Sequence, residues 1–242
     1  MDIMEKVEIA GLRPDMLDGE SVEPAIQKTI GVLLFPGFEM LDVYGPMDMW
    51  ANLNLAPAKL WGGADKMVGV RLVTVAAKRG EVPAHGGPKT VADFGYDDAP
   101  QFDYLVVPGG WGVIPLVKDQ TTLNWLRTRA QNAEIVMSVC NGASLLAAAG
   151  ILDGRQATTN KLLWKEATES GPKVKWVEKA RWVDGGTIVT ASGIAAGMDM
   201  THAVISRLYG KDIATWLELW TEYEPHRDPS WDPFAAMAGL VR

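Results

Sequence analysis

The sequence predicts a single α/β domain with a mainly parallel sheet that is covered by helices on both faces. Short apolar runs alternate along the chain with segments of helical spacing, and strands that alternate with helices are typical of βαβ units. The runs are hydrophobic almost throughout, as strands are when a parallel sheet is buried on both sides. With 242 residues, no internal repeat and no linker-like stretch, the chain has the length of one large domain.

The domain is expected to span residues 29–223. Residues 1–28 carry a net charge of −4 and lack sustained periodicity, so we interpret them as an N-terminal extension. Residues 224–242 are interrupted by prolines, and we expect this C-terminal extension to wrap the surface or a partner subunit.

In the first half of the chain, apolar runs bounded by turn residues predict three strands. The first, "TIGVLLF", ends at Pro36 and Gly37, and the third, "DYLVVPGG", ends in a glycine turn. The segment "DVYGPMDMWANL" between the first two strands has helical spacing, with Asp42 near its start. The expected strands are therefore 29–35, 70–77 and 103–110, and the expected helix is 42–53.

In the second half, a helix with Leu123 and Leu126 on one side precedes a fourth strand, "EIVMSVC", and a strongly helical stretch, "GASLLAAAGIL", follows that strand. Two more strands are expected around the turn at Asp184, and they are followed by two final helices. The expected ranges are 121–133, 134–140, 142–152, 173–192, 196–210 and 211–224.

Composition and charge exclude several classes of function. The chain has 30 acidic and 23 basic residues, without the basic stripe that nucleic-acid binding needs. The bases between Lys161 and Arg181 alternate with glutamates, which favours a solvated face. No apolar run is long enough to cross a bilayer, and the first residues do not resemble a secretory signal. A single cysteine allows no intrachain disulfide and is compatible with a cytoplasmic protein.

Three polar segments follow predicted strands at their carboxyl ends, where open α/β sheets bind ligands. Asp42 follows the first strand, Gly109 and Gly110 follow the third, and Cys140 follows the fourth. If these strands are neighbours in the sheet, their ends meet at one site.

Cys140 lies at a turn from strand to helix, where free backbone N–H groups and the helix dipole favour an anion. We therefore expect its thiolate to form below the ordinary pKa of about 8.5. Gly142 removes a side chain where backbone segments pass closely, as a nucleophile turn requires. Asp42 is placed to exchange a proton with the thiol. The alternatives are that Cys140 is inert core and that Asp42 caps a helix.

With the segments "GVLLFPGFEMLDVYGPMDMW", "DYLVVPGGWG", "IVMSVCNGASLLAAAGILDGRQATTN" and "IVTASGIAAGMDM", residues 29–223 resemble the DJ-1/PfpI superfamily, and within it the isocyanide hydratase branch. The resemblance implies a flavodoxin-like fold, a homodimer, a small-molecule substrate and no cofactor or metal. It implies that Cys140 is the nucleophile, that Asp42 is its acidic partner, and that the N–H groups of Gly110 and Asn141 line an oxyanion hole.

The sequence departs from the family at two positions. Asn141 stands where hydratase-like members commonly have threonine, and Asn160 stands where many relatives have histidine. None of the three histidines, His85, His202 and His226, matches a catalytic position of the family, and His202 is expected to pack or face solvent. Amide hydrolysis normally needs a positioned imidazole to protonate the leaving amine, so amidase and glyoxalase activities lose support.

Trp111 follows the glycine turn, and Trp164 comes soon after Asn160. These three residues, Trp111, Asn160 and Trp164, are candidates for the substrate pocket; core packing is the alternative for both tryptophans. The favoured function is hydration of a small isocyanide to an N-substituted formamide through a covalent thioimidate on Cys140. A redox-responsive stress protein with an oxidisable Cys140 is the second possibility. A ligand-sensing domain is the third, and no basic DNA-binding module follows the domain to favour it.

Overall fold

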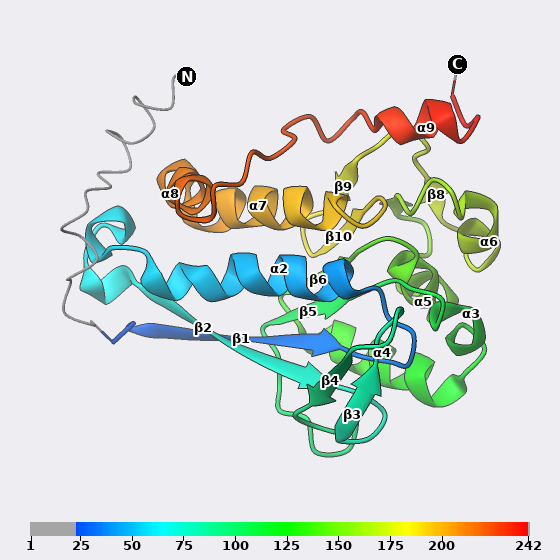
Figure 1. The fold of residues 1–242 in the computed structure, drawn as a ribbon, viewed down its shortest axis with the longest axis horizontal. Helices are drawn as coiled ribbons and strands as arrows, with labels where there is room; N and C mark the ends of the chain where they lie inside the picture. Colours follow the sequence, from blue (N-terminus) through cyan, green and yellow to red (C-terminus); the bar gives the residue numbers. More distant parts are fainter. Residues whose placement is uncertain (1–22, 242) are drawn as a thin grey trace.

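The computed structural model describes residues 23–241, and residues 1–22 of the expected extension over residues 1–28 lie outside this range. A six-stranded sheet forms the centre of the fold, in the order β2-β1-β5-β6-β10-β9 (Figure 1). The first five strands are parallel, and β9 pairs antiparallel with β10 at one edge. The strands are β1 (Ile26–Leu33), β2 (Val68–Val75), β5 (Tyr104–Val107), β6 (Ile135–Ser138), β9 (Trp182–Asp184) and β10 (Ile188–Ala191).

Helices cover both faces of the sheet, as the sequence predicts, and the layers form the flavodoxin-like fold. The helices form two groups. In the first, α7 packs against both α2 and α8, and in the second, α4 packs against α5. The bounds are α2 (Met40–Asn52), α4 (Gln120–Asn132), α5 (Gly142–Ala148), α7 (Ala196–Tyr209) and α8 (Lys211–Thr221).

The central strands are short and apolar because helices bury them on both faces. All four residues of β5 and all four of β6 are buried. Neither strand has a face toward water, so neither shows the alternation of polar and apolar residues that a half-exposed strand has. Gly31 in β1 leaves room for the ring of Phe102, because a Cβ there would lie 2.6 Å from that ring.

Several short elements were not predicted, because two to six residues carry too little periodicity to identify them. The strands β3 (Gly80–Pro83) and β4 (Lys89–Ala92) form a separate hairpin, and β7 (Gln156–Ala157) pairs with β8 (Lys175–Trp176). The remaining helical segments are η2 (Leu53–Leu55), η3 (Ala58–Trp61), η4 (Ala64–Lys66), α3 (Val113–Leu116), α6 (Trp164–Glu169) and α9 (Pro233–Met237).

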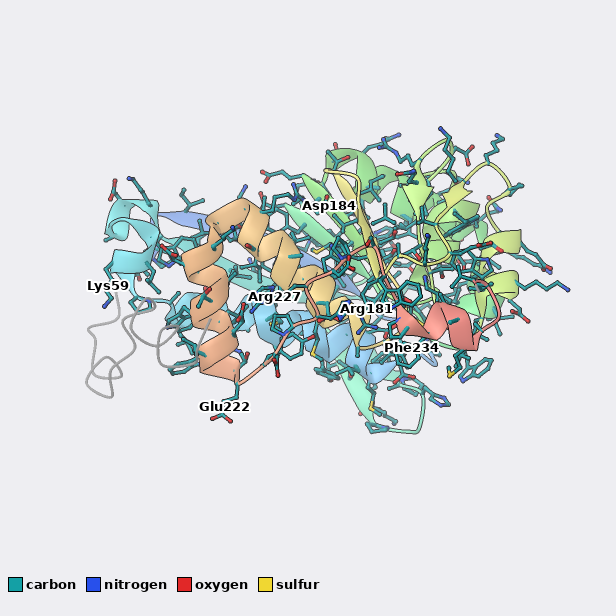
Figure 2. All side chains as sticks on the ribbon, turned by 90° about the horizontal axis from the view of Figure 1, so that it is seen from above. Lys59, Arg181, Asp184, Glu222, Arg227 and Phe234 are labelled. Atoms are coloured by element: carbon teal, nitrogen blue, oxygen red, sulfur yellow. The ribbon has the colours of Figure 1, made fainter. Side chains whose placement is uncertain are left out.

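The C-terminal extension runs back over its own domain. From Glu222 at the end of α8 it passes Arg227 and Arg181 and reaches Phe234 in α9 (Figure 2). Its backbone meets the outer edge of the sheet, where Arg181 N–H donates to Pro229 O at 2.8 Å. Among residues 23–241, no helix is long and apolar enough to cross a membrane.

Candidate active site

The three strands that precede the expected site residues are neighbours in the sheet. β5 pairs with β1 on one side and with β6 on the other, so the carboxyl ends of these strands meet at one edge. The chain also changes direction here, since β2 lies on one side of β1 and β5 on the other. This is the crevice in which open α/β folds bind ligands.

Cys140 lies at this crevice in a left-handed backbone conformation, with φ of 56°, which is unfavourable for a residue with a side chain. Hydrogen bonds hold the turn from both sides, because Cys140 N–H donates to Ser192 O at 2.9 Å and Thr159 Oγ1 donates to Cys140 O at 3.0 Å. Gly142 is required, since a Cβ there would lie 2.3 Å from Val107 O. The close approach predicted at Gly142 is therefore present.

Three donors surround the sulfur of Cys140. Asn160 Nδ2 donates to Sγ at 3.0 Å, and the backbone N–H groups of Asn141 and Ile194 lie near enough to the sulfur to lower its pKa. Asn160 Oδ1 accepts from Leu163 N at 3.0 Å, which turns the amide nitrogen toward the sulfur. Each of these donors favours the thiolate over the thiol.

Asp42 is fully buried in the first turn of α2. Its Oδ2 accepts from Gly109 N at 2.8 Å, its Oδ1 has no hydrogen-bond partner among the described residues, and the carboxyl and the Cys140 thiol interact electrostatically. The alternative of a helix cap does not hold, because the N-cap residue of α2 is Glu39. The structure therefore brings the carboxyl and the thiol together, as the positions of the strands predict.

Burial raises the pKa of both Asp42 and Cys140 and so favours their protonated forms. Burial, followed by the charge of Asp42, raises the pKa of the Cys140 thiol to about 12, against the hydrogen bonds that favour the thiolate. Burial and the charge of Glu39 likewise raise the pKa of Asp42 to about 7. The prediction of a low thiol pKa is wrong, because only 5% of Cys140 is exposed and α5 has only seven residues.

Gly110 does not offer the free N–H group that an oxyanion hole needs. Its N–H donates to Asn141 Oδ1 at 2.8 Å, and Asn141 Nδ2 returns a bond to Gly110 O at 3.2 Å. Asn141 N–H points to the sulfur instead. The expected pair of donors is thus occupied within the protein, because residue 141 has a side chain that matches both backbone groups of Gly110.

The three expected pocket residues differ in their environments. Asn160 contacts the sulfur directly. Trp111 is 55% exposed, which excludes core packing for it. Trp164 is half-buried, with its ring edge-on to Trp176 and its face toward Lys161 Nζ at 5.0 Å, so the core alternative is partly met there.

None of the three histidines, all within the described residues, hydrogen-bonds to Cys140 or Asp42. His202 is buried in α7, with its Nε2 2.8 Å from Glu218 Oε1, so it packs inside the protein. His85 and His226 are exposed, and only the backbone N–H of each is hydrogen-bonded, to Phe38 O and to Asp199 Oδ1. The chemistry near Cys140 therefore relies on a carboxyl and an amide.

Sequence reasoning missed the roles of Ser192, Ile194 and Thr159. Ser192 and Ile194 follow β10, the strand next to β6, so the rule about strand ends applies to them too. Ile194 also has a positive φ of 43°. No sequence signal marks a β-branched residue for this conformation, which tertiary contacts impose.

A pH-dependent stability follows from the buried Asp42. Its pKa of about 7 in the folded protein exceeds the ordinary 3.8, so folding favours the protonated acid. The protonated acid therefore stabilises the folded state fully at pH values below the ordinary pKa, and this stabilisation is lost as the pH rises through about 7. Relative to Asp42→Asn, the wild type should lose about 2 kcal/mol of unfolding free energy between pH 5 and pH 8. Urea unfolding of both proteins at each pH measures the difference, and equal pH dependence would contradict it.

Comparison with known proteins places these features in a family. The profile of the DJ-1/PfpI family matches residues 28–207. Isonitrile hydratase of Pseudomonas putida is 36% identical over 196 residues, which cover 81% of this chain and 78% of that protein. The HTH-type transcriptional regulator GbdR of Pseudomonas aeruginosa is 26% identical over 202 residues, and the chain spans 52% of its length.

Solved structures share the fold. A THiJ/PfpI family protein from Pseudomonas syringae aligns with a TM-score of 0.70 at 23% identity, over 95% of this chain and 90% of that one. DJ-1beta of Drosophila melanogaster aligns with a TM-score of 0.64 at 18% identity, over 82% of this chain and 100% of that one.

The layered parallel sheet and the cysteine elbow at its strand ends define a flavodoxin-like α/β protein with a cysteine-centred site. The match to the family profile covers most of the chain, and the relative from Pseudomonas putida supports it. The chain belongs to the DJ-1/PfpI family.

Proposed function

We propose that this protein hydrates a small isocyanide to an N-substituted formamide, with Cys140 as the nucleophile and Asp42 as the group that moves protons. The meeting of the Cys140 thiol and the buried Asp42 carboxyl at the ends of neighbouring strands carries the proposal. The identity of 36% with an isonitrile hydratase supports this choice of substrate class. We also propose that the protein is a homodimer, as the family resemblance implies.

In the first step, the sulfur attacks the terminal carbon of the isocyanide while the Asp42 carboxylate takes the thiol proton. Asp42 then returns this proton to the same carbon, and a thioimidate with a C–S bond results. A carboxyl with a pKa of about 7 suits both transfers near neutral pH. No imidazole is needed, in agreement with the lack of a histidine bonded to Cys140 or Asp42 among residues 23–241.

In the second step, water adds across the C=N bond of the thioimidate. Its oxygen joins the carbon, and Asp42 passes one of its protons to the nitrogen. The C–S bond then breaks with its electron pair on sulfur, the hydroxyl proton moves through Asp42 to the sulfur, and the formamide leaves. One isocyanide and one water thus give one formamide, and the thiol and the carboxylate are restored.

The donors around the sulfur support this leaving step. Asn160 Nδ2 and the N–H of Ile194 stabilise negative charge on Sγ as the C–S bond breaks. The raised thiol pKa weighs against the redox alternative, because selective oxidation follows thiolate character and exposure.

The test is incubation of the purified protein with an aryl isocyanide, followed by chromatography of the formamide. Multiple turnovers with one formamide for each isocyanide consumed are expected. Absence of formamide above the uncatalysed background, across several aryl and alkyl isocyanides, would overturn the proposal.

A further prediction concerns the occupied N–H of Gly110. Asn141→Ala should free this group to stabilise an oxyanion, so cleavage of p-nitrophenyl acetate by Cys140 should become about tenfold faster. Release of p-nitrophenol measures the rate. Asn160→Ala is the matched control, because it removes an amide that does not touch Gly110 and should not accelerate cleavage. An unchanged rate in Asn141→Ala would show that Gly110 N–H has no catalytic use.

A further inference from the structure

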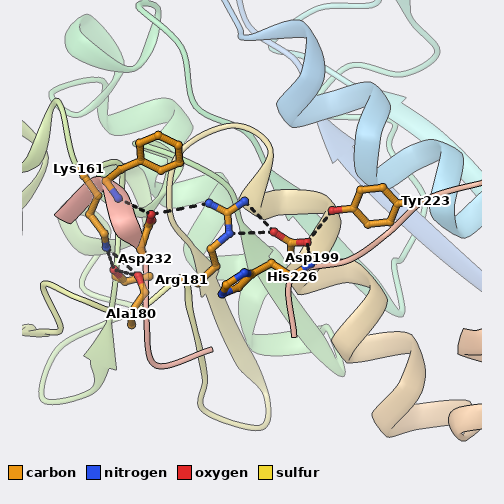
Figure 3. Close-up of polar contacts among 9 residues, drawn as sticks. Lys161, Ala180, Arg181, Asp199, Tyr223, His226 and Asp232 are labelled. Carbon is orange, nitrogen blue, oxygen red and sulfur yellow. Dashed lines mark hydrogen bonds and ion pairs between the residues drawn. The ribbon is translucent and has the colours of Figure 1, made fainter. Parts of the chain in front are cut away.

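Four charged side chains are buried together where the C-terminal extension meets the domain (Figure 3). They are Lys161, Arg181, Asp199 and Asp232, and none is more than 9% exposed. The expectation of a solvated basic face over residues 161–181 is therefore wrong for Lys161 and Arg181, although the lysines between them are exposed. Buried charges are costly unless they are paired, so this cluster requires an explanation.

Residues 224–240, here termed the strap, are anchored on the domain at several points. His226 N–H donates to Asp199 Oδ1 at 2.8 Å, and both terminal nitrogens of Arg227 donate to the carboxylate of Glu218. Asp232 N–H donates to Lys179 O at 2.6 Å. Asp199 in turn holds Arg181, whose Nε donates to Asp199 Oδ2 at 2.8 Å.

Asp232 is the fully buried carboxylate of the strap. Its Oδ1 accepts from Phe234 N at 3.1 Å and lies 3.8 Å from Arg181 Nη1. Its Oδ2 has no hydrogen-bond partner among the described residues. The remaining interaction of Asp232 is electrostatic attraction to Lys161.

Lys161 is the buried lysine of this cluster. Its Nζ donates to Thr158 Oγ1 at 2.6 Å and to Ala180 O at 2.8 Å. The charged groups that act on it are Asp232 and Glu178, which attract it, and Arg181, which repels it. Burial lowers the pKa of Lys161 to about 8, so without these carboxylates its charge would be harder to keep.

Lys161 belongs to the loop that touches the candidate nucleophile. In residues 158–161, Thr159 Oγ1 holds the carbonyl of Cys140, and Asn160 Nδ2 donates to its sulfur. Lys161 is adjacent to Asn160, and its ammonium ties the loop to Ala180 and, through charge, to the strap. The strap and the sulfur are thus linked through residues 179–180, because Asp232 N–H donates to Lys179 O while Lys161 Nζ donates to the adjacent Ala180 O.

We propose that the strap is a positioning device for the active site, in which Asp232 holds Lys161 in place and thereby keeps Asn160 in hydrogen-bond contact with Cys140 Sγ. Asp232 and Lys161 are positioning residues, since neither touches the sulfur. The proposal deepens the proposed function, because it rests on Cys140 as the reacting group. Its test uses the chemistry of the sulfur alone, so it remains decisive for any substrate.

The experiment measures the rate at which iodoacetamide alkylates Cys140 at pH 9, followed by mass spectrometry of the whole protein. Asn160→Ala removes a donor to the thiolate and should slow alkylation about tenfold. Asp232→Asn and Lys161→Met should each slow it about fivefold, because a displaced Asn160 loses the same bond. In the Asn160→Ala background, neither change should alter the rate by more than about twofold, since the bond is already absent. Arg227→Gln, which releases the strap only from Glu218, is the matched control and should alkylate like the wild type.

The signs of the effects separate positioning from a simple effect of charge. Removal of the Asp232 charge favours a thiolate, and removal of the Lys161 charge disfavours it, so charge alone predicts faster alkylation in one variant and slower in the other. The proposal would be overturned by opposite effects of the two substitutions, or by alkylation rates equal to that of the wild type. Equal slowing in the presence and absence of the Asn160 side chain would overturn it too. If Asp232→Asn fails to unfold cooperatively in urea, Lys161→Met decides through its comparison with and without Asn160→Ala: slowing that disappears in the Asn160→Ala background supports positioning, and equal slowing in both backgrounds overturns it.

Discussion

Cys140→Ser is expected to abolish isocyanide hydration, with a fall in kcat/KM of at least about a thousandfold. Serine fits the turn, because its side chain has nearly the size of cysteine and the backbone bonds to Ser192 O and from Thr159 Oγ1 are kept. Its hydroxyl, however, is a far weaker acid than a thiol. Asp42, with a pKa of about 7, cannot take its proton at a useful rate. Formamide production under saturating isocyanide measures the loss.

Urea unfolding provides the control for this variant, which should remain folded with nearly the stability of the wild type. Undiminished turnover in a folded Cys140→Ser protein would exclude the covalent thioimidate. The function would then have to be assigned to another group at the strand ends.

Asp42→Asn is expected to lower kcat/KM by about a hundredfold to ten-thousandfold, the usual contribution of a positioned acid or base. The asparagine oxygen can still accept from Gly109 N–H, so the turn after β5 keeps its bond. What is lost is the proton acceptor. In the wild type, the base must be ionised, so kcat/KM should rise with pH through about 7 and then level off. The variant should lack this rise, and rates from pH 5 to pH 9 test it.

Glu39→Gln is a matched control for this prediction. The charge of Glu39 raises the pKa of Asp42, so its removal should move the rise of kcat/KM to lower pH and leave the plateau unchanged. If kcat/KM of Glu39→Gln rises at the same pH as in the wild type, the pH dependence belongs to another group. A rise that persists in Asp42→Asn would remove Asp42 from the mechanism.

Much of the fold was predictable because its signals are local. The apolar runs at β1, β2, β5 and β6 and the helical spacing of α2, α4, α7 and α8 lie within a few residues of the predicted positions. β1 begins at Ile26, three residues before the expected start of the domain. The short hairpin of β3 and β4 was not predicted, and the helix α5, which has seven residues, was predicted to be longer. Tertiary contacts set the lengths of such short elements.

The position of the candidate site was also predictable. Asp42, the glycine turn and Cys140 each follow a strand, and in a parallel sheet neighbouring strands end at the same edge. The partners of these residues were harder to foresee. Asn141 was identified as a departure, but only the structure shows that its amide occupies Gly110.

The sequence by itself determined the layered fold and the convergence of a carboxyl and a thiol, because periodicity and strand ends are local properties of the chain. Only the tertiary structure decided the ionisation of that pair and the burial of Lys161 and Arg181. The physical reason is that a pKa depends on desolvation and on charges brought from distant segments. Residues 42, 140, 160 and 232 come from four different parts of the sequence, and folding alone sets the distances between them.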